Sequence, residues 1–254
     1  QDLLSLIFYY YNFRVAITEI PQELCHIFWS LCIEEHFYLF WPFFVFSLQR
    51  HSLEKLCLFG IISSFLLRTY VISAGHWLPV AYLITPCRLD GLLLGSLLAL
   101  SLRRGELSRA WIWRAATPIA FASLIAIFVT QGHFYDFIDI RRIPSRSTDS
   151  SVVLTLGLLF LAIFFAGMLF SLLQMSRSTW PIRVLENRFL MAVGKYSYGI
   201  YILHVLVLKA WEFLLHKFFG RLLSLPNVFV KLISFVVVAQ ATLMLAALVY
   251  HTFE

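Results

Sequence analysis

Long apolar runs recur from one end of the sequence to the other, and only short polar connections separate them. A bilayer core about 30 Å thick takes roughly 20 apolar residues for each helical crossing. The chain is 60% hydrophobic and only 13% charged, and its mean hydropathy of +0.81 lies far above that of soluble domains. We therefore expect an all-α fold, a polytopic transmembrane helical bundle with lipid around most of its surface.

Seven apolar segments are long enough to be complete crossings. They are 26–48, 56–74, 80–102, 113–130, 151–175, 189–215 and 227–250. The segment 80–102 has an irregular start, and residues 3–13 look like the tail of a further, partial crossing. No polar linker marks a second domain. Residues 1–254 are therefore expected to form a single membrane-embedded domain that is truncated at its N-terminus and its C-terminus.

The net charge of +6 raises the question of a nucleic-acid partner. The Lys and Arg residues lie in the connections between apolar segments, and not along a polar face. The connections near residues 50–55, 103–114 and 177–188 hold more of them than the alternate connections do. Because cytoplasmic loops are enriched in Lys and Arg, these connections should be cytoplasmic. We expect membrane lipid, and no nucleic acid, as a partner.

The first polar cluster lies inside the segment 26–48. One helical stripe, spaced i, i+4, i+8, i+11, is formed by Ser30, Glu34, Tyr38 and Trp41. Glu35 points about 100° away from it, so the two carboxylates meet different surroundings. Either glutamate could transfer a proton or form an ion pair. The alternative is a structural role, with one glutamate in a salt bridge and the other facing water at the interface.

The second cluster lies at the irregular start of the segment 80–102. Pro86 can open a helix, and Asp90 then falls in the first turn, where the helix dipole favours a negative group. Arg88 and Asp90 are two residues apart and do not face each other, so each is expected to have a partner elsewhere. Arg88 could hold a carboxylate of the first cluster or an anionic ligand, and a structural bridge to a glutamate is the alternative.

The third cluster places Ser197, Tyr201 and His204 at i, i+4 and i+7, so that a hydroxyl, a phenol and an imidazole line one helical face. His204 lies near the middle of its segment, where it could serve catalysis or donate a hydrogen bond to a neighbouring helix. The other histidines show no metal-ligand spacing, and there is no glycine-rich phosphate loop. We expect no metal and no bound cofactor.

Three runs carry a family likeness. Residues 30–42 read Ser-Leu-x-x-Glu-Glu-x-Phe-Tyr-Leu-x-x-Pro, residues 88–95 read Arg-x-Asp-x-x-x-x-Gly, and residues 197–204 read Ser-Tyr-x-x-Tyr-x-x-His. In this order, they resemble the signatures of the acyltransferase-3 family, and the resemblance covers essentially the whole chain. Glu254 looks like the acidic residue that closes the last helix of the family.

The resemblance implies an enzyme of the bacterial inner membrane. Members of the family are multi-pass O-acyltransferases that move an acyl group, usually acetyl, from acyl-CoA to a hydroxyl of a cell-surface or secreted polysaccharide or another carbohydrate. Acyl-CoA would then be a co-substrate, and a carbohydrate or lipid-linked glycan the acceptor. The residues assigned by the motifs are Glu34 and Glu35 as catalytic and Ser30, Tyr38, Arg88, Asp90, Ser197, Tyr201 and His204 as substrate-binding.

One departure from the family pattern concerns the catalytic base. The essential histidine of the family lies on its first helix after an arginine, and nothing in this chain matches it. We expect that base in a missing N-terminal part, and this fragment alone is expected to lack it. Glu34 or Glu35 would orient the histidine or bind the acceptor, while Arg88 would fix a carboxylate or a donor group.

Two other functions remain open from the residues. A transporter or flippase also places Glu, Arg and His inside the membrane, although no inverted repeat is apparent. A lipid-linked glycan-binding protein without catalytic activity is the third possibility.

Overall fold

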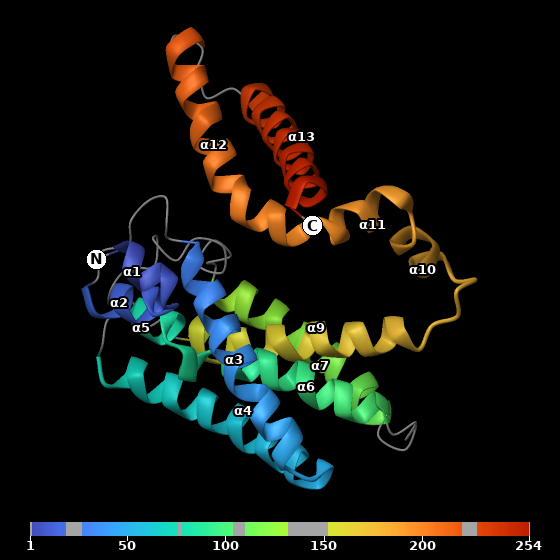
Figure 1. Cartoon of the computed structure of the whole chain (residues 1–254). Coiled ribbons are helices and arrows are strands. Elements are labelled where there is room, and N and C mark those ends of the chain that lie inside the picture. Colours follow the sequence, from blue (N-terminus) through green and yellow to red (C-terminus); the bar gives the residue numbers. More distant parts are fainter. Residues whose placement is uncertain are drawn as a thin grey trace. The chain divides into compact units, whose positions relative to one another are not determined.

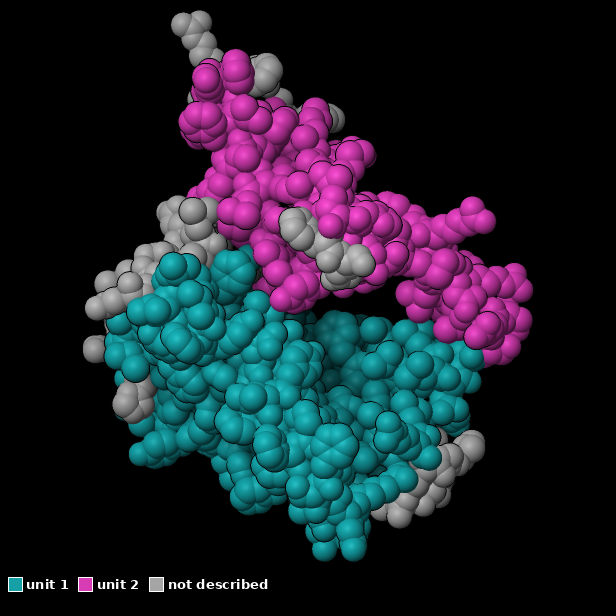
Figure 2. Space-filling view, in the orientation of Figure 1, with its two compact units in different colours: residues 1–175 teal, residues 176–254 magenta. Residues whose placement is uncertain are grey.

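A computed structural model describes residues 2–18, 27–75, 78–103, 110–131, 152–219 and 228–253. These residues form helices joined by turns, with no strand among them, which confirms the all-α class (Figure 1). The chain divides into two compact units, residues 1–175 and residues 176–254 (Figure 2). Each unit is described by itself.

Five helical stretches in the described residues are long and apolar enough to cross a membrane, so the chain is a multi-pass helical membrane protein. They lie in α4 (Arg50–Ser73), α7 (Ala110–Gln131), the π-helical turn η5 (Val153–Gly157) with α9 (Leu158–Leu173), α12 (Ser197–Phe219) and α13 (Val228–Phe253). The other two expected crossings, 26–48 and 80–102, differ from these five. The first forms a helix whose apolar run contains the charged residues Glu34 and Glu35. The second is broken into shorter helices.

The first unit begins with two short helices, α1 (Asp2–Ile7) and α2 (Tyr11–Thr18). The expected continuous tail over residues 3–13 is therefore interrupted. At the interruption Tyr9 adopts φ 55°, a left-handed conformation that is uncommon for residues other than glycine. The expected segment 26–48 forms one helix, α3 (Phe28–Ser47), which contains Glu34 and Glu35.

The expected segment 80–102 is broken, as its irregular start indicated. It forms α5 (Leu78–Leu83), the 3₁₀ turn η1 (Thr85–Cys87) and α6 (Leu89–Arg103). Pro86 lies inside η1 and has no N–H to continue an α-helix from α5. The break separates a helix of 6 residues from one of 15 residues.

The packed part of the first unit joins α4 to α6, α6 to α9 and α7 to α9. A shared core is formed by Leu94, Leu98, Trp113, Ala166 and Phe170. In it, the Trp113 and Phe170 rings are stacked with their centroids 6.2 Å apart. Helices α7 and α9 approach closely at Gly167, where a Cβ would collide with the side chain of Thr117. Such small-residue contacts let membrane helices pack backbone to backbone.

The second unit consists of α10 (Trp180–Leu185), α11 (Arg188–Lys195) and the helices α12 and α13. The expected crossing 189–215 is divided at Tyr196, where α11 ends before α12 begins. Helix α12 packs on α13, with Gly199 against Ala246. A Cβ on Gly199 would lie 3.1 Å from that of Ala246, so this contact too depends on a small residue.

Candidate active site

The break between α5 and α6 lies at the centre of the candidate site. Backbone groups that leave a helix at membrane depth need other partners, because lipid offers none. The carbonyl oxygen of Leu83 accepts a hydrogen bond of 3.1 Å from Nδ2 of Asn12. The carbonyl oxygen of Cys87 accepts one of 2.6 Å from Nη1 of Arg68. Polar side chains of α2 and α4 thus replace the helical bonds that the break removes.

Arg68 also connects the break to the rest of the unit. Its side chain is fully buried, and its Nη2 lies 2.7 Å from Oδ2 of Asp90 in a charge-assisted hydrogen bond. The same nitrogen donates to the carbonyl oxygen of Thr155 in η5, at 3.2 Å. π-Helical turns are rare and frequently mark functional sites. One arginine therefore ties α4, the start of α6 and this turn together.

The partner of Asp90 was expected outside its own cluster, and the Arg68 contact confirms this. Arg68 itself is the residue that the motif reasoning missed. A single charge inside the otherwise apolar segment 56–74 was the available signal, because charges within membrane segments almost always have a partner or a function.

Thr85 holds the break against α3. Its Oγ1 accepts a hydrogen bond of 2.9 Å from Nδ2 of Asn12, and it lies 2.8 Å from Nδ1 of His36. Thr85 and Asn12 are both buried. His36, the residue between the glutamates and Phe37, is thus used to fasten α3 to the break.

Arg88 follows the break and lies beside aromatic rings. Its guanidinium carbon is 4.7 Å from the centroid of the Tyr82 ring, which in turn lies 4.8 Å from the Trp29 ring. In the described part of the chain, no carboxylate forms an ion pair with Arg88, so the bridge to a glutamate of α3 is not formed there. A cation over an aromatic face keeps its hydrogen-bond donors available to other groups.

A hollow of about 170 Å³ adjoins Arg88. Arg88, Asp90 and Gly91 line it together with apolar residues of α9, among them Leu161 and Phe165. No group of three or more His, Cys, Asp or Glu side chains in the described ranges could hold a metal ion.

The stripe on α3 lies away from the packed core of the unit. Helix α3 buries Cys32 and Ile33, whereas Glu34 and Tyr38 are exposed and Glu35 is half-buried. Neither glutamate forms an ion pair or a side-chain hydrogen bond with any residue that the structure describes. The structural salt bridge considered for this pair is therefore not formed there.

Ser30 and Trp41 complete the stripe, and both are half-buried. The hydroxyl of Ser30 donates to the carbonyl oxygen of Ile27 at 3.2 Å. The stripe therefore runs from a half-buried start at the beginning of α3 to an exposed middle.

The third cluster belongs to the second unit. Ser197 is the first residue of α12, and the Tyr201 and His204 rings lie 5.8 Å apart on one side of that helix. Nδ1 of His204 lies 2.6 Å from the carbonyl oxygen of Tyr201. Because a carbonyl only accepts, Nδ1 must carry the proton and donate, which leaves Nε2 for another partner. Glu254 lies outside the described residues.

Together these features define a class, namely a multi-pass helical membrane protein with a broken helix anchored by a buried Arg–Asp pair. A family model described as an acyltransferase domain, that of acyltransferase-3, matches residues 1–249. The chain therefore belongs to the acyltransferase-3 family and is a membrane acyltransferase. Comparison with curated proteins and with solved structures gives no match.

Proposed function

We propose that this acyltransferase works in the bacterial inner membrane. It moves an acyl group, acetyl in the simplest case, from acyl-CoA to a hydroxyl of a cell-surface or secreted carbohydrate. The observation that carries the proposal is the pair Glu34 and Glu35, two adjacent carboxylates on an apolar helix with no ionic partner in the described residues. Unpaired carboxylates inside a membrane segment are expensive and are retained for function.

The reaction needs a proton acceptor near the attacking hydroxyl. The hydroxyl oxygen forms a bond to the thioester carbonyl carbon, the carbon–sulfur bond breaks, and the hydroxyl proton passes to a base while the thiolate leaves. In this proposal Glu34 or Glu35 accepts a hydrogen bond from the acceptor or orients the base. Holding a thioester and a hydroxyl in register lowers the barrier further, because it removes the entropy of bringing them together.

Arg88 is assigned to the donor. A guanidinium presents donors in a planar fork that suits phosphate, carboxylate and developing oxyanions, and Arg88 forms no ion pair in the described residues. Broken membrane helices commonly line substrate sites, and Arg88 stands directly after such a break. Asp90, whose Oδ2 is bonded to Arg68, positions this segment.

The hydroxyl-bearing residues are assigned to the carbohydrate. Ser30 and Tyr38 stand on the same stripe as Glu34, and Ser197 and Tyr201 share a helical side with His204. Hydroxyl, phenol and imidazole groups both donate and accept hydrogen bonds, as sugar hydroxyls require.

The test is an assay of the complete protein with radiolabelled acyl-CoA and membrane-bound glycan. We expect Glu34→Gln or Glu35→Gln to reduce transfer by about 100-fold, the lower range for loss of acid–base catalysis. Glu186→Gln is the matched control, because Glu186 is exposed between α10 and α11. Normal transfer by both glutamine variants would remove the pair from the mechanism. Glycan transport without acyl transfer would favour a flippase.

A further inference from the structure

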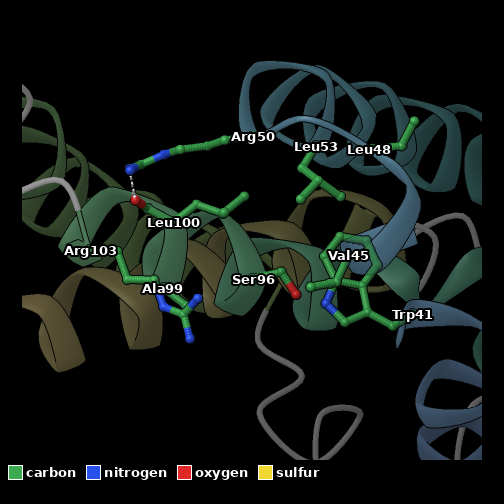
Figure 3. Close-up of a pocket in the computed structure, with 9 residues that line it drawn as sticks. All are labelled: Trp41, Val45, Leu48, Arg50, Leu53, Ser96, Ala99, Leu100 and Arg103. Carbon is green, nitrogen blue, oxygen red and sulfur yellow. Dashed lines mark hydrogen bonds between the residues drawn. The ribbon is translucent and has the colours of Figure 1, made fainter. Parts of the chain in front are cut away.

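A second and larger hollow lies elsewhere in the first unit, where α3 passes into α4 and α6 ends (Figure 3). Its volume is about 440 Å³. Trp41, Val45 and Leu53 supply apolar walls, and Ser96, Arg50 and Arg103 supply polar groups. None of Glu34, Glu35 and Arg88 lines it.

The two arginines mark the ends of helices. Arg50 is the first residue of α4, which has 24 residues and is long enough to cross the bilayer, and Arg103 is the last residue of α6. Ends of crossing helices lie level with the lipid headgroups. Trp41 and Val45 lie within α3, before its end at Ser47, so they belong to the part of the wall that precedes the headgroup level. The hollow is thus apolar inside and cationic at the membrane surface.

The mouth of the hollow carries an excess of positive charge. Arg50 donates through Nη2 to the carbonyl oxygen of Leu100 (Figure 3). Its Nε lies 3.5 Å from Oε1 of Glu54, which offsets its charge. Arg103 is exposed and has no ion-pair partner in the described residues. The N-terminus of α4 adds to the field, because the side chain of Gln49 does not cap it.

We propose that this hollow binds an anionic phospholipid, with the phosphate between Arg50 and Arg103 and an acyl chain against Trp41 and Val45. Basic pockets between membrane helices at the headgroup level recognise anionic lipids. A soluble phosphate compound shares the phosphate chemistry, but it would leave the apolar walls in contact with water. A phospholipid offers a phosphate to the arginines and an acyl chain to the apolar walls. The proposed site is independent of acyl transfer.

The first experiment measures lipid binding to the purified full chain by native mass spectrometry, with titrated phosphatidylglycerol and, separately, phosphatidylcholine. We expect phosphatidylglycerol to bind more tightly, and Arg103→Gln to weaken its binding about tenfold, the effect of one charge-assisted hydrogen bond. Arg114→Gln is the matched control, since Arg114 is also exposed near the start of α7 but does not line the hollow. Equal binding by both variants would overturn the proposal.

A second variant tests the apolar wall without changing charge. Ala99 lines the hollow and is exposed to it, so Ala99→Phe should fill it and weaken phosphatidylglycerol binding about tenfold or more, while circular dichroism shows unchanged helix content. Undiminished binding by this variant would place the lipid elsewhere and refute the site.

A third experiment adds inorganic phosphate or coenzyme A in competition with the lipid. Displacement of the lipid at equal concentration would assign the hollow to a soluble phosphate compound and overturn the lipid assignment.

Discussion

The two units place their polar side chains differently. In the first unit, Arg68, Asp90 and Asn12 are buried and bonded within the helical core. In the second unit, the corresponding contacts lie where α11 meets α12 and α13 ends. There Nζ of Lys195 is 4.4 Å from the centroid of the Tyr250 ring, and the hydroxyl of Tyr196 lies 3.0 Å from Nε2 of His251.

The difference follows from helix continuity. The first unit contains a broken helix, whose freed carbonyl groups need donors inside the protein. Helices α12 and α13 run without a break, so their backbone carbonyl groups keep helical partners and small residues such as Gly199 and Ala246 let the helices pack closely. The buried polar side chains that bond between elements here, Arg68, Asp90 and Asn12, therefore accompany irregular backbone, and their removal should affect the first unit most.

The largest effect is expected from Arg68→Met. Removing one partner of a buried ion pair leaves an uncompensated charge and destabilises by about 3–5 kcal/mol. In this protein the change also removes the donor to Cys87 and Thr155. Thermal unfolding of the purified protein in detergent should show the lower stability.

The double variant Arg68→Met with Asp90→Leu separates the effect of the unpaired carboxylate from the effect of the lost hydrogen bonds to backbone carbonyl groups. It should regain part of the stability, because the unpaired carboxylate is gone, but not all of it, because the carbonyl groups remain without a donor. A midpoint for Arg68→Met equal to that of the wild type would break the link between the buried arginine and the helix break.

A smaller loss, about 1–3 kcal/mol, is expected from Thr85→Val, which keeps the shape but leaves polar groups of Asn12 and His36 without this partner. Thr69→Val is the control, because among the described residues the hydroxyl of Thr69 bonds only within its own helix, to the carbonyl oxygen of Phe65. The same thermal assay compares the two. If Thr69→Val lowered stability as much as Thr85→Val, the contact between α3 and the break would not be the cause.

The smallest effect is expected from Tyr196→Phe in the second unit. The lost bond to His251 is open to solvent, so water can replace it, and the change should stay below about 1 kcal/mol. Thermal unfolding measured beside Thr85→Val provides the comparison. A loss as large as that of Thr85→Val would show that the second unit also depends on polar contacts.

The sequence predicted much of the helical architecture because apolar length is a strong signal in a membrane protein. It also predicted the irregular start of the segment 80–102, since Pro86 cannot continue an α-helix. It did not predict the division at Tyr196 or the one at Tyr9, where no proline marks the change. In both places the apolar pattern continues across the break.

The candidate site was predictable only in part. Helical spacing grouped Ser30, Glu34 and Tyr38. It could not tell which face of α3 packs, because α3 carries apolar residues on all of its faces. The partner of Asp90 was also beyond reach, since Arg68 lies 22 residues away and meets it only through tertiary packing. Helical spacing predicts which residues share a face of one helix, but it does not predict which residues pair between helices.

The shortness of α6 affects how far a polar group must travel through lipid. A helix of its 15 residues is about 22 Å long, so it would fall short of about 30 Å of hydrocarbon even if it stood upright in the bilayer. With Arg103 at one surface, the start of an upright α6 would stand about 8 Å beneath the opposite surface. A polar group that enters from that leaflet would reach the depth of Arg88 after crossing roughly a quarter of the bilayer.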